Sequence, residues 1–149
     1  MIRLAVLEDI PEVVRMSDAF YKTTSYHTLS KIPINYDTVA SLAESLIQDE
    51  TLYVAELAKK VCGMLAMISV PFIFNTDYRH LAEIAWWVDE EAKGAGVGKL
   101  LLKQAELVGI SVGAAHVQMA DLISSGDLPG KIYLKEGYIL TERLWTKVL

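Results

Sequence analysis

The apolar residues follow two patterns along the chain: short apolar runs, which predict strands, and a spacing of three to four residues, which predicts helices. A short apolar run over Ile2–Leu7 predicts a first strand. Asp9 then precedes Pro11, a combination typical of a helix N-terminus, because aspartate caps free amide groups and proline suits the first turn. The apolar residues that follow recur at helical spacing as far as Tyr21. The chain is therefore expected to open with a strand and a helix.

A second helix and three extended segments are expected next. After a loop over Ser25–Asn35, the apolar residues between Val39 and Ile47 have helical spacing, with Asp37 or Thr38 as the cap. Three strand-like runs then cover Thr51–Leu57, Val61–Val70, which Pro71 ends, and His80–Val88. A tight turn over residues 58–60 joins the first two of these runs. The third is nearly all apolar, as expected of a central strand covered on both faces.

The last third of the chain alternates helices and strands. A turn punctuated by glycines leads into a helix over Val97–Val108, and Val117–Leu122 is expected to form a strand. A short helix over Leu128–Glu136 follows, and Tyr138–Leu149 is expected to form one or two closing strands. This order of elements predicts an α/β fold in which a mixed sheet carries helices on both faces.

Length, composition and charge narrow the class of protein. A chain of 149 residues with 52% hydrophobic residues is expected to form a single domain, residues 1–149. A net charge of −5 and the lack of a basic run argue against a nucleic-acid partner. The longest apolar stretch, Val61–Phe74, is shorter than the about 20 residues that span a bilayer, so no membrane partner is expected. With one cysteine, Cys62, and no basic leader, a cytoplasmic location is expected.

The segment with the clearest chemistry begins where the apolar strand ends at Val88. Gly94, Gly96 and Gly98 punctuate the turn that opens the next helix. Free amide groups and the helix dipole at such a position favour a phosphate group, and glycine lets the main chain approach it. Lys99 stands where a dinucleotide-binding fingerprint needs its third glycine, and a P-loop also fails here. A glycine-rich turn without a ligand remains the alternative.

This segment resembles the signature of the GNAT superfamily of N-acetyltransferases. In that signature an apolar strand ends in valine, and an Arg/Gln-x-x-Gly-x-Gly/Ala motif then starts a helix. Here Val88 ends the strand and the motif starts at Lys93, which replaces the commoner Arg or Gln. A second stretch, Tyr133–Tyr138, resembles the family's Tyr-Glu-Lys-Leu-Gly-Phe. The resemblance extends to the first strand and helix and so covers most of the chain.

The resemblance implies a GNAT-like fold with a mixed, mostly antiparallel central sheet and helices on both faces. It implies acetyl-CoA as cosubstrate, with the pyrophosphate on the amide groups of the glycine-rich turn. The pantetheine arm is expected to pair with the central strand, where that strand splays from its neighbour. The implied cosubstrate-binding residues are Trp87, Val88, Lys93, Gly94, Ala95, Gly96, Val97, Gly98 and Lys99. No metal site is expected, because no Cys and His residues stand at ligand spacing.

Two side chains are candidates for acid–base chemistry. Tyr133 occupies the family's position for the acid that protonates the leaving thiolate, although it could instead pack beneath the sheet. Glu83 is the candidate base, or the anchor of a water that carries the proton, because a carboxylate in an apolar strand is costly to bury unpaired. Pairing of Glu83 with Arg79 or a surface lysine is the alternative.

Strand alternation makes further predictions about the side chains of the central strand. It places Glu83 on one face together with Leu81, Ala85 and Trp87. The adjacent Trp86 and Trp87 should therefore point to opposite faces.

The resemblance implies an N-acetyltransferase that transfers an acetyl group to a primary amine by direct attack in a ternary complex. A non-catalytic acyl-CoA-binding or sensor domain is the alternative, and an interaction domain without a ligand is a third. The acceptor is expected to be a small-molecule or peptide amine, with His27, in an aromatic loop with Tyr21 and Tyr26, as a candidate for lining its pocket. A homodimer is possible, because the C-terminal strands of such domains often pair across one.

Overall fold

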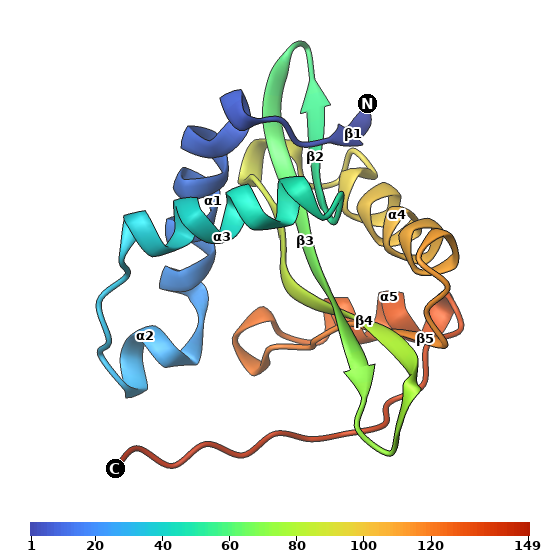
Figure 1. Cartoon of the computed structure of the whole chain (residues 1–149). Helices are drawn as coiled ribbons and strands as arrows, with labels where there is room; N and C mark the ends of the chain where they lie inside the picture. Colours follow the sequence, from blue (N-terminus) through green and yellow to red (C-terminus); the bar gives the residue numbers. More distant parts are fainter.

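A five-stranded sheet runs through the middle of the molecule in the order β1-β2-β3-β4-β5 (Figure 1). The computed structural model describes all of residues 1–149. The strands are β1 (Ile2–Leu4), β2 (Leu52–Leu57), β3 (Lys60–Phe72), β4 (Asn75–Val88) and β5 (His116–Gln118). Neighbouring strands are antiparallel except for β4 and β5, which are parallel. The predicted mixed, mostly antiparallel sheet is therefore confirmed.

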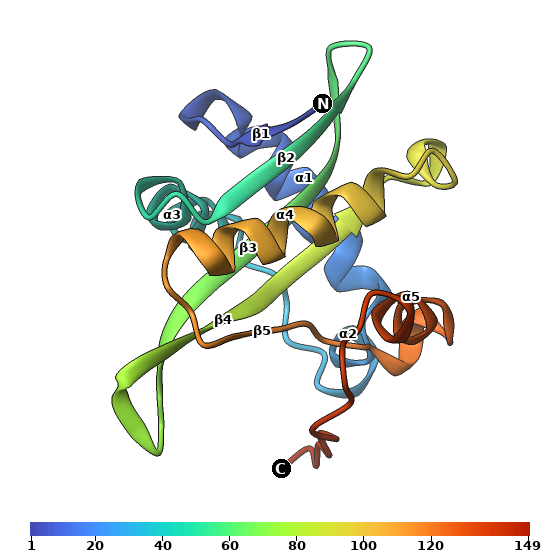
Figure 2. The same cartoon turned by 90° about the vertical axis from the view of Figure 1, so that its right-hand side faces the viewer.

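Helices cover both faces of this sheet, as the sequence predicts. They are α1 (Ile10–Thr23), α2 (Ser25–Leu29), α3 (Tyr36–Gln48), α4 (Val97–Ser111) and α5 (Leu128–Lys135), with 3-10 turns at Leu7–Asp9, Glu90–Ala92 and Ile123–Ser125. Helices α1 and α3 lie together on one face (Figure 1), and α4 crosses the opposite face (Figure 2). None of these helices is both long and apolar enough to cross a bilayer.

The hydrophobic core has two layers, one on each face of the sheet. Met16 of α1 and Leu46 of α3 pack in the first layer with Met64 of β3. Leu101 and Val108 of α4 pack in the second layer, which includes other residues of β3. Trp87 packs against the first layer and Trp86 against the second, so the prediction that these two side chains point to opposite faces is confirmed.

A β-bulge interrupts the alternation of side chains in β4. Ala66 of β3 pairs with Ala85, but its neighbour Met67 pairs with Glu83, which leaves Ile84 as the extra residue. Ile84 and Ala85 consequently both pack in the α1/α3 layer, whereas Leu81 packs in the α4 layer. The prediction that Leu81, Glu83, Ala85 and Trp87 share one face is therefore wrong, because it assumed an uninterrupted period of two.

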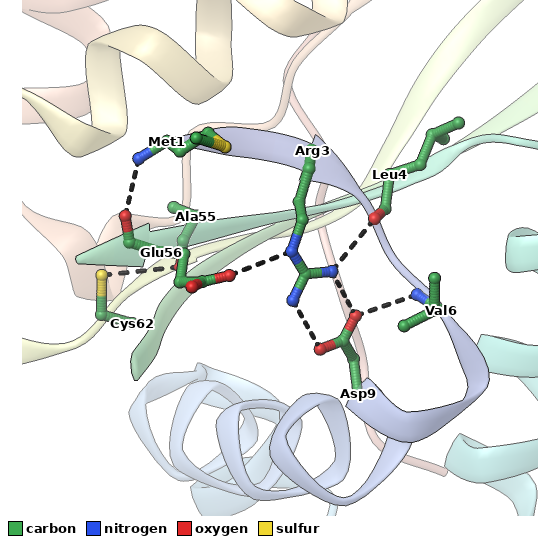
Figure 3. Close-up of polar contacts among 8 residues, drawn as sticks. All are labelled: Met1, Arg3, Leu4, Val6, Asp9, Ala55, Glu56 and Cys62. Carbon is green, nitrogen blue, oxygen red and sulfur yellow. Dashed lines mark hydrogen bonds and ion pairs between the residues drawn. The ribbon is translucent and has the colours of Figure 1, made fainter. Parts of the chain in front are cut away.

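Charged side chains tie the first strand to the start of α1 (Figure 3). Arg3 donates to both carboxylate oxygens of Asp9, at 2.7 and 2.9 Å, and to Glu56 of β2 at 3.0 Å. Asp9 stands at the N-cap position of α1, but its carboxylate accepts from the Val6 N–H and caps no helix amide. The hydrogen bond from Arg3 outweighs burial and lowers the pKa of Asp9 below its usual value. In the same region the thiol of buried Cys62 lies 3.6 Å from the carbonyl oxygen of Ala55 (Figure 3).

Several predicted boundaries of the N-terminal half are wrong by a few residues. The loop predicted over Ser25–Asn35 contains the short helix α2. Asn35 caps α3 by accepting from the Thr38 N–H at 2.9 Å, so neither Asp37 nor Thr38 is the cap.

The tight turn predicted between β2 and β3 is present. The chain turns back at Ala58 and Lys59, which have left-handed φ angles of 48° and 66°.

The largest differences between the predicted and the observed elements lie at the ends of strands. Pro71 does not end β3, because it pairs with Arg79 and the strand continues to Phe72. Strand β5 ends at Gln118 rather than at Leu122. The segment 138–149 forms no strand and extends away from the body (Figure 1). Tyr138 packs against Tyr133, but the large apolar side chains from Ile139 on are exposed, 84% for Leu144 and 90% for Trp145, so the predicted closing strands are absent.

Candidate active site

Strands β4 and β5 separate after a ladder of three pairs. The pairs are His80 with His116, Leu81 with Val117, and Ala82 with Gln118. Strand β4 then continues to Val88 with a partner only on its β3 side. The main-chain groups of residues 83–88 that face away from β3 are therefore left for another partner. This opening is the splay that the family resemblance implies.

The two acid–base candidates meet at one residue beside this opening. The Ala120 N–H donates to Oε2 of Glu83 at 2.8 Å, and the Tyr133 hydroxyl donates to the Ala120 carbonyl oxygen at 2.8 Å. The alternative pairing of Glu83 with Arg79 does not occur, because Arg79 donates to the side chain and main chain of Ser69, both at 2.8 Å. Sequence reasoning named Glu83 and Tyr133 separately, and no local pattern pointed to Ala120 between them.

The surroundings of Glu83 and Tyr133 change how both groups titrate. Burial raises the pKa of Glu83 to about 7, although the N–H groups of Ala120 and Trp86 act in the opposite direction. Burial, and then the nearby Glu83 carboxylate, raise the pKa of Tyr133 above its ordinary value. Tyr133 also packs between Trp86 and Tyr138, with ring centroids 5.6 and 5.7 Å away. Glu83 can therefore exchange a proton near neutral pH, while Tyr133 keeps its proton there.

The glycines around the start of α4 have two different roles. Gly94 and Gly96 have φ angles of +82° and +80°, and a Cβ on either would meet no atom within 4 Å. A Cβ on Gly98 would lie 3.3 Å from the Trp86 ring, so this glycine serves close packing of α4 on the sheet. The first-turn amides that follow Gly96 have no partner within the helix. An open, left-handed turn thus leads into a helix end that suits an anion.

The side chains of the same turn are already engaged. Lys93 lies 2.6 Å from Glu90 and 5.9 Å above the Trp87 ring centroid, and Lys99 lies 2.8 Å from Glu136. Val97 is buried in the α4 layer, and the Ala95 N–H donates to a carbonyl of the preceding turn at 3.3 Å. The free donors of this segment are therefore mainly main-chain amides.

One ion pair beside the turn, between a buried aspartate and an exposed arginine, was missed by sequence reasoning. Asp89, which is 7% exposed, follows β4 directly and accepts from both terminal nitrogens of Arg15 in α1, at 3.1 and 2.7 Å. The indole N–H of Trp87 donates to the same carboxylate at 2.9 Å, and the Asp89 N–H donates to the Cys62 carbonyl. Burial alone would raise the pKa of Asp89, but the donors lower it. An aspartate after an apolar strand was the available signal, whereas Arg15 lies 74 positions away.

A separate hollow of about 510 Å³ lies beside the end of α1, α2 and the start of α3. Tyr21, His27 and Tyr36 line it, and the Tyr21 and His27 rings are 5.3 Å apart. Neither Glu83 nor Tyr133 lines this hollow. The structure contains no group of three or more His, Cys, Asp and Glu side chains that could hold a metal ion.

Solved structures of similar fold cover nearly the whole chain. A transcriptional regulator from Bacillus halodurans C-125 has a TM-score of 0.78 at 18% identity, over 100% of this chain and 99% of that one. Ribosomal-protein-alanine N-acetyltransferase from Brucella melitensis biovar Abortus 2308 has a TM-score of 0.72 at 15% identity, over 100% of this chain and 99% of that one. A predicted acetyltransferase with acetyl-CoA from Clostridium acetobutylicum has a TM-score of 0.72 at 15% identity, over 100% of this chain and 95% of that one. At these identities the likeness shows the fold alone.

Sequence comparison identifies the family. No curated protein sequence matches the chain. The model of the acetyltransferase (GNAT) family matches residues 16–127, a range that includes the splayed strand, the glycine turn and α4 and stops before Tyr133. The sequence resemblance, the splay and this match agree, and the chain belongs to the GNAT family of acetyltransferases.

Proposed function

We propose that this chain is an acetyl-CoA-dependent N-acetyltransferase acting on a primary amine, and that residues 1–149 work as one acyltransferase domain. The observation that carries the proposal is the meeting of Glu83 and Tyr133 at Ala120, beside the opening between β4 and β5. Two titratable side chains thus lie beside an unpaired strand edge, where acid and base groups could serve an acyl transfer.

The cosubstrate would lie along the opening and across the start of α4. The open left-handed turn fits a diphosphate, because nothing occupies the space beside Gly94 and Gly96. The unpaired edge of β4 near Trp87 and Val88 would pair with the amides of the pantetheine arm. The first-turn amides of α4, at Val97, Gly98 and Lys99, would supply donors to the diphosphate. Gly94 and Gly96 would give the open turn, and Lys93 and Ala95, whose N–H groups donate within the preceding turn, would line it.

The proposed reaction is a direct transfer in a ternary complex. Glu83, directly or through a water, takes the proton of the acceptor ammonium, so that the free amine attacks the thioester carbonyl carbon. A main-chain N–H near Val88 stabilises the oxyanion of the tetrahedral intermediate. The new N–C bond forms, the C–S bond breaks, and Tyr133 gives its proton to the departing sulfur. The nitrogen then loses its second proton, which passes through solvent and restores the Tyr133 hydroxyl, while the proton held by Glu83 leaves to solvent. Tyr133 must first release the Ala120 carbonyl to which it donates in the free protein.

The acceptor would be a small-molecule or peptide amine. The hollow beside α2 is a candidate for its recognition, because the aromatic rings of Tyr21, His27 and Tyr36 line it together with Asp18, whose carboxylate pairs with Lys22. Replacing His27 with alanine should then raise KM for the amine and leave KM for acetyl-CoA unchanged. An equal change in both constants would argue against this assignment.

A non-catalytic acyl-CoA-binding or sensor domain is the second candidate function. It would use the same glycine turn and strand edge, and it would not need Glu83 to titrate near neutral pH. The E83Q variant separates the two, because it should bind acetyl-CoA but lose turnover in an enzyme.

We also propose that the chain forms a homodimer through the segment 138–149. That segment carries exposed apolar residues, including Leu144 and Trp145, and has strand-like composition but no strand partner. The short edge strand β5 has one free edge to offer a second copy.

Calorimetric titration with acetyl-CoA, CoA and NADH tests the proposed function directly. Micromolar binding of both CoA species and none of NADH is expected, followed by amine-dependent release of free thiol. Binding without thiol release from any amine would favour the sensor domain. Absence of CoA binding would contradict both candidate functions.

A further inference from the structure

The main chain of Ala120 lies just beyond the last pair of the β4–β5 ladder. Continued pairing would join its N–H and carbonyl groups to β4. Instead, side chains from two different elements take them: Glu83 of β4 accepts from the N–H, and Tyr133 of α5 donates to the carbonyl. Both bonds are 2.8 Å long, so the two polar groups are satisfied without a strand neighbour.

The side chain of the next residue, Asp121, reaches α5: a Cβ on Gly130, in the first half of α5, would lie 2.7 Å from its Oδ2. Ala120 is therefore held between β4, through Glu83, and α5, through Tyr133. The segment 120–121 forms the wall of the opening opposite the free edge of β4.

We propose that Glu83 and Tyr133 are also positioning residues, which together hold Ala120 and so keep the β4–β5 opening in its ligand-ready shape. This role rests on the proposed function, because the occupant of the opening is acetyl-CoA. It is separate from proton transfer, since a hydrogen-bonding oxygen at position 83 and a hydroxyl at position 133 are all that it needs. If this wall is fixed before binding, the protein does not lose conformational entropy there when acetyl-CoA binds, and the affinity is higher.

Two substitutions at Glu83 separate the two roles. E83Q keeps an oxygen that accepts from the Ala120 N–H, whereas E83A removes it. Calorimetry should give a Kd for acetyl-CoA within about threefold of wild type for E83Q, and about tenfold weaker for E83A. Thiol release should be lost in both variants. Equal Kd values for E83A and wild type would overturn the positioning role of Glu83.

Two tyrosines of the same cluster provide a matched pair. Y133F removes the hydroxyl that holds the Ala120 carbonyl, and about three- to tenfold weaker binding of acetyl-CoA is expected. Y138F removes a buried hydroxyl that has no hydrogen-bond partner, so the Kd should stay at the wild-type value. Equal losses in Y133F and Y138F would show that general packing, and not the Ala120 contact, sets affinity.

Amide hydrogen exchange of Ala120 tests the inference without any cosubstrate. In the free protein the Ala120 amide should exchange about tenfold faster in E83A than in wild type, and E83Q should restore slow exchange. Unchanged exchange in E83A would overturn the proposal. If wild-type protein failed to bind acetyl-CoA, the proposed function would fail, and the exchange rates alone would decide whether Glu83 holds Ala120.

Discussion

Glu83 is a carboxyl group whose ionisation is tuned by its surroundings. Burial raises its pKa to about 7, so the group loses its proton near neutral pH. A base must be deprotonated to act, and we therefore expect kcat/KM to rise with pH through a midpoint near the pKa of about 7. In E83Q this rise of kcat/KM with pH should disappear, along with most of the activity. Retention of the same midpoint in E83Q would assign it to another group.

Arg15 stabilises a second buried carboxylate, that of Asp89. R15M leaves this carboxylate with the Trp87 indole as its remaining side-chain donor, and we expect a loss of about 1–3 kcal/mol in the free energy of unfolding. The exposed pair of Lys22 with Asp18 provides the control, since water screens this pair and K22M should leave the free energy of unfolding nearly unchanged. The pKa of Asp89 is lowered by folding, so its pairing stabilises the protein above the unfolded pKa of about 3.9 and the difference should shrink below it. Urea unfolding at pH 7 and pH 3 measures both effects.

At the scale of elements, the turn before α4 combines left-handed main-chain angles with an open space. G96V places a branched side chain in the left-handed region, and G113V does the same at the other end of α4, where φ is +66° and the space is also open. Both variants should lose a similar roughly 1–2 kcal/mol of stability. Only G96V should lose acetyl-CoA binding, by more than tenfold. Similar affinities of the two variants in calorimetry would place the diphosphate elsewhere.

The β2–β3 hairpin carries avoidable strain in its two-residue turn. Ala58 and Lys59 both have positive φ angles, which suit asparagine and glycine better than these residues. K59G should therefore raise the free energy of unfolding by up to about 1 kcal/mol. K60G, at the first position of β3, should lower it, because glycine weakens a strand. If thermal unfolding showed no gain in stability for K59G, the turn would not be strained.

At the scale of the whole molecule, the exposed C-terminal segment predicts self-association. Wild-type protein should sediment as a dimer, and L144D together with W145D should give a monomer, because charges would replace the apolar contacts between copies. Both side chains are exposed in the single chain, so the substitutions should leave its unfolding temperature nearly unchanged. A wild-type monomer in analytical ultracentrifugation would contradict the homodimer.

The sequence predicts local features of this molecule better than those set by contacts between distant segments. The glycine turn and the end of the apolar central strand at Val88 depend on short patterns, and both are where they were predicted, although β4 begins at Asn75 rather than at His80. The bulge at Ile84 and the bond between Arg15 and Asp89 depend on contacts with distant residues. The positions of Glu83 and Tyr133 could be named from the sequence, but their meeting at Ala120 requires β5 and α5 to be placed in space.

Cys62 can report local unfolding of the layer between the sheet and α4. It is the only cysteine, it is buried between the sheet and α4, and burial raises the pKa of its thiol. A thiol reagent can therefore reach it only when this layer comes apart. The rate of labelling in native buffer consequently measures how often α4 lifts from the sheet. Acetyl-CoA bound at the start of α4 should slow that labelling.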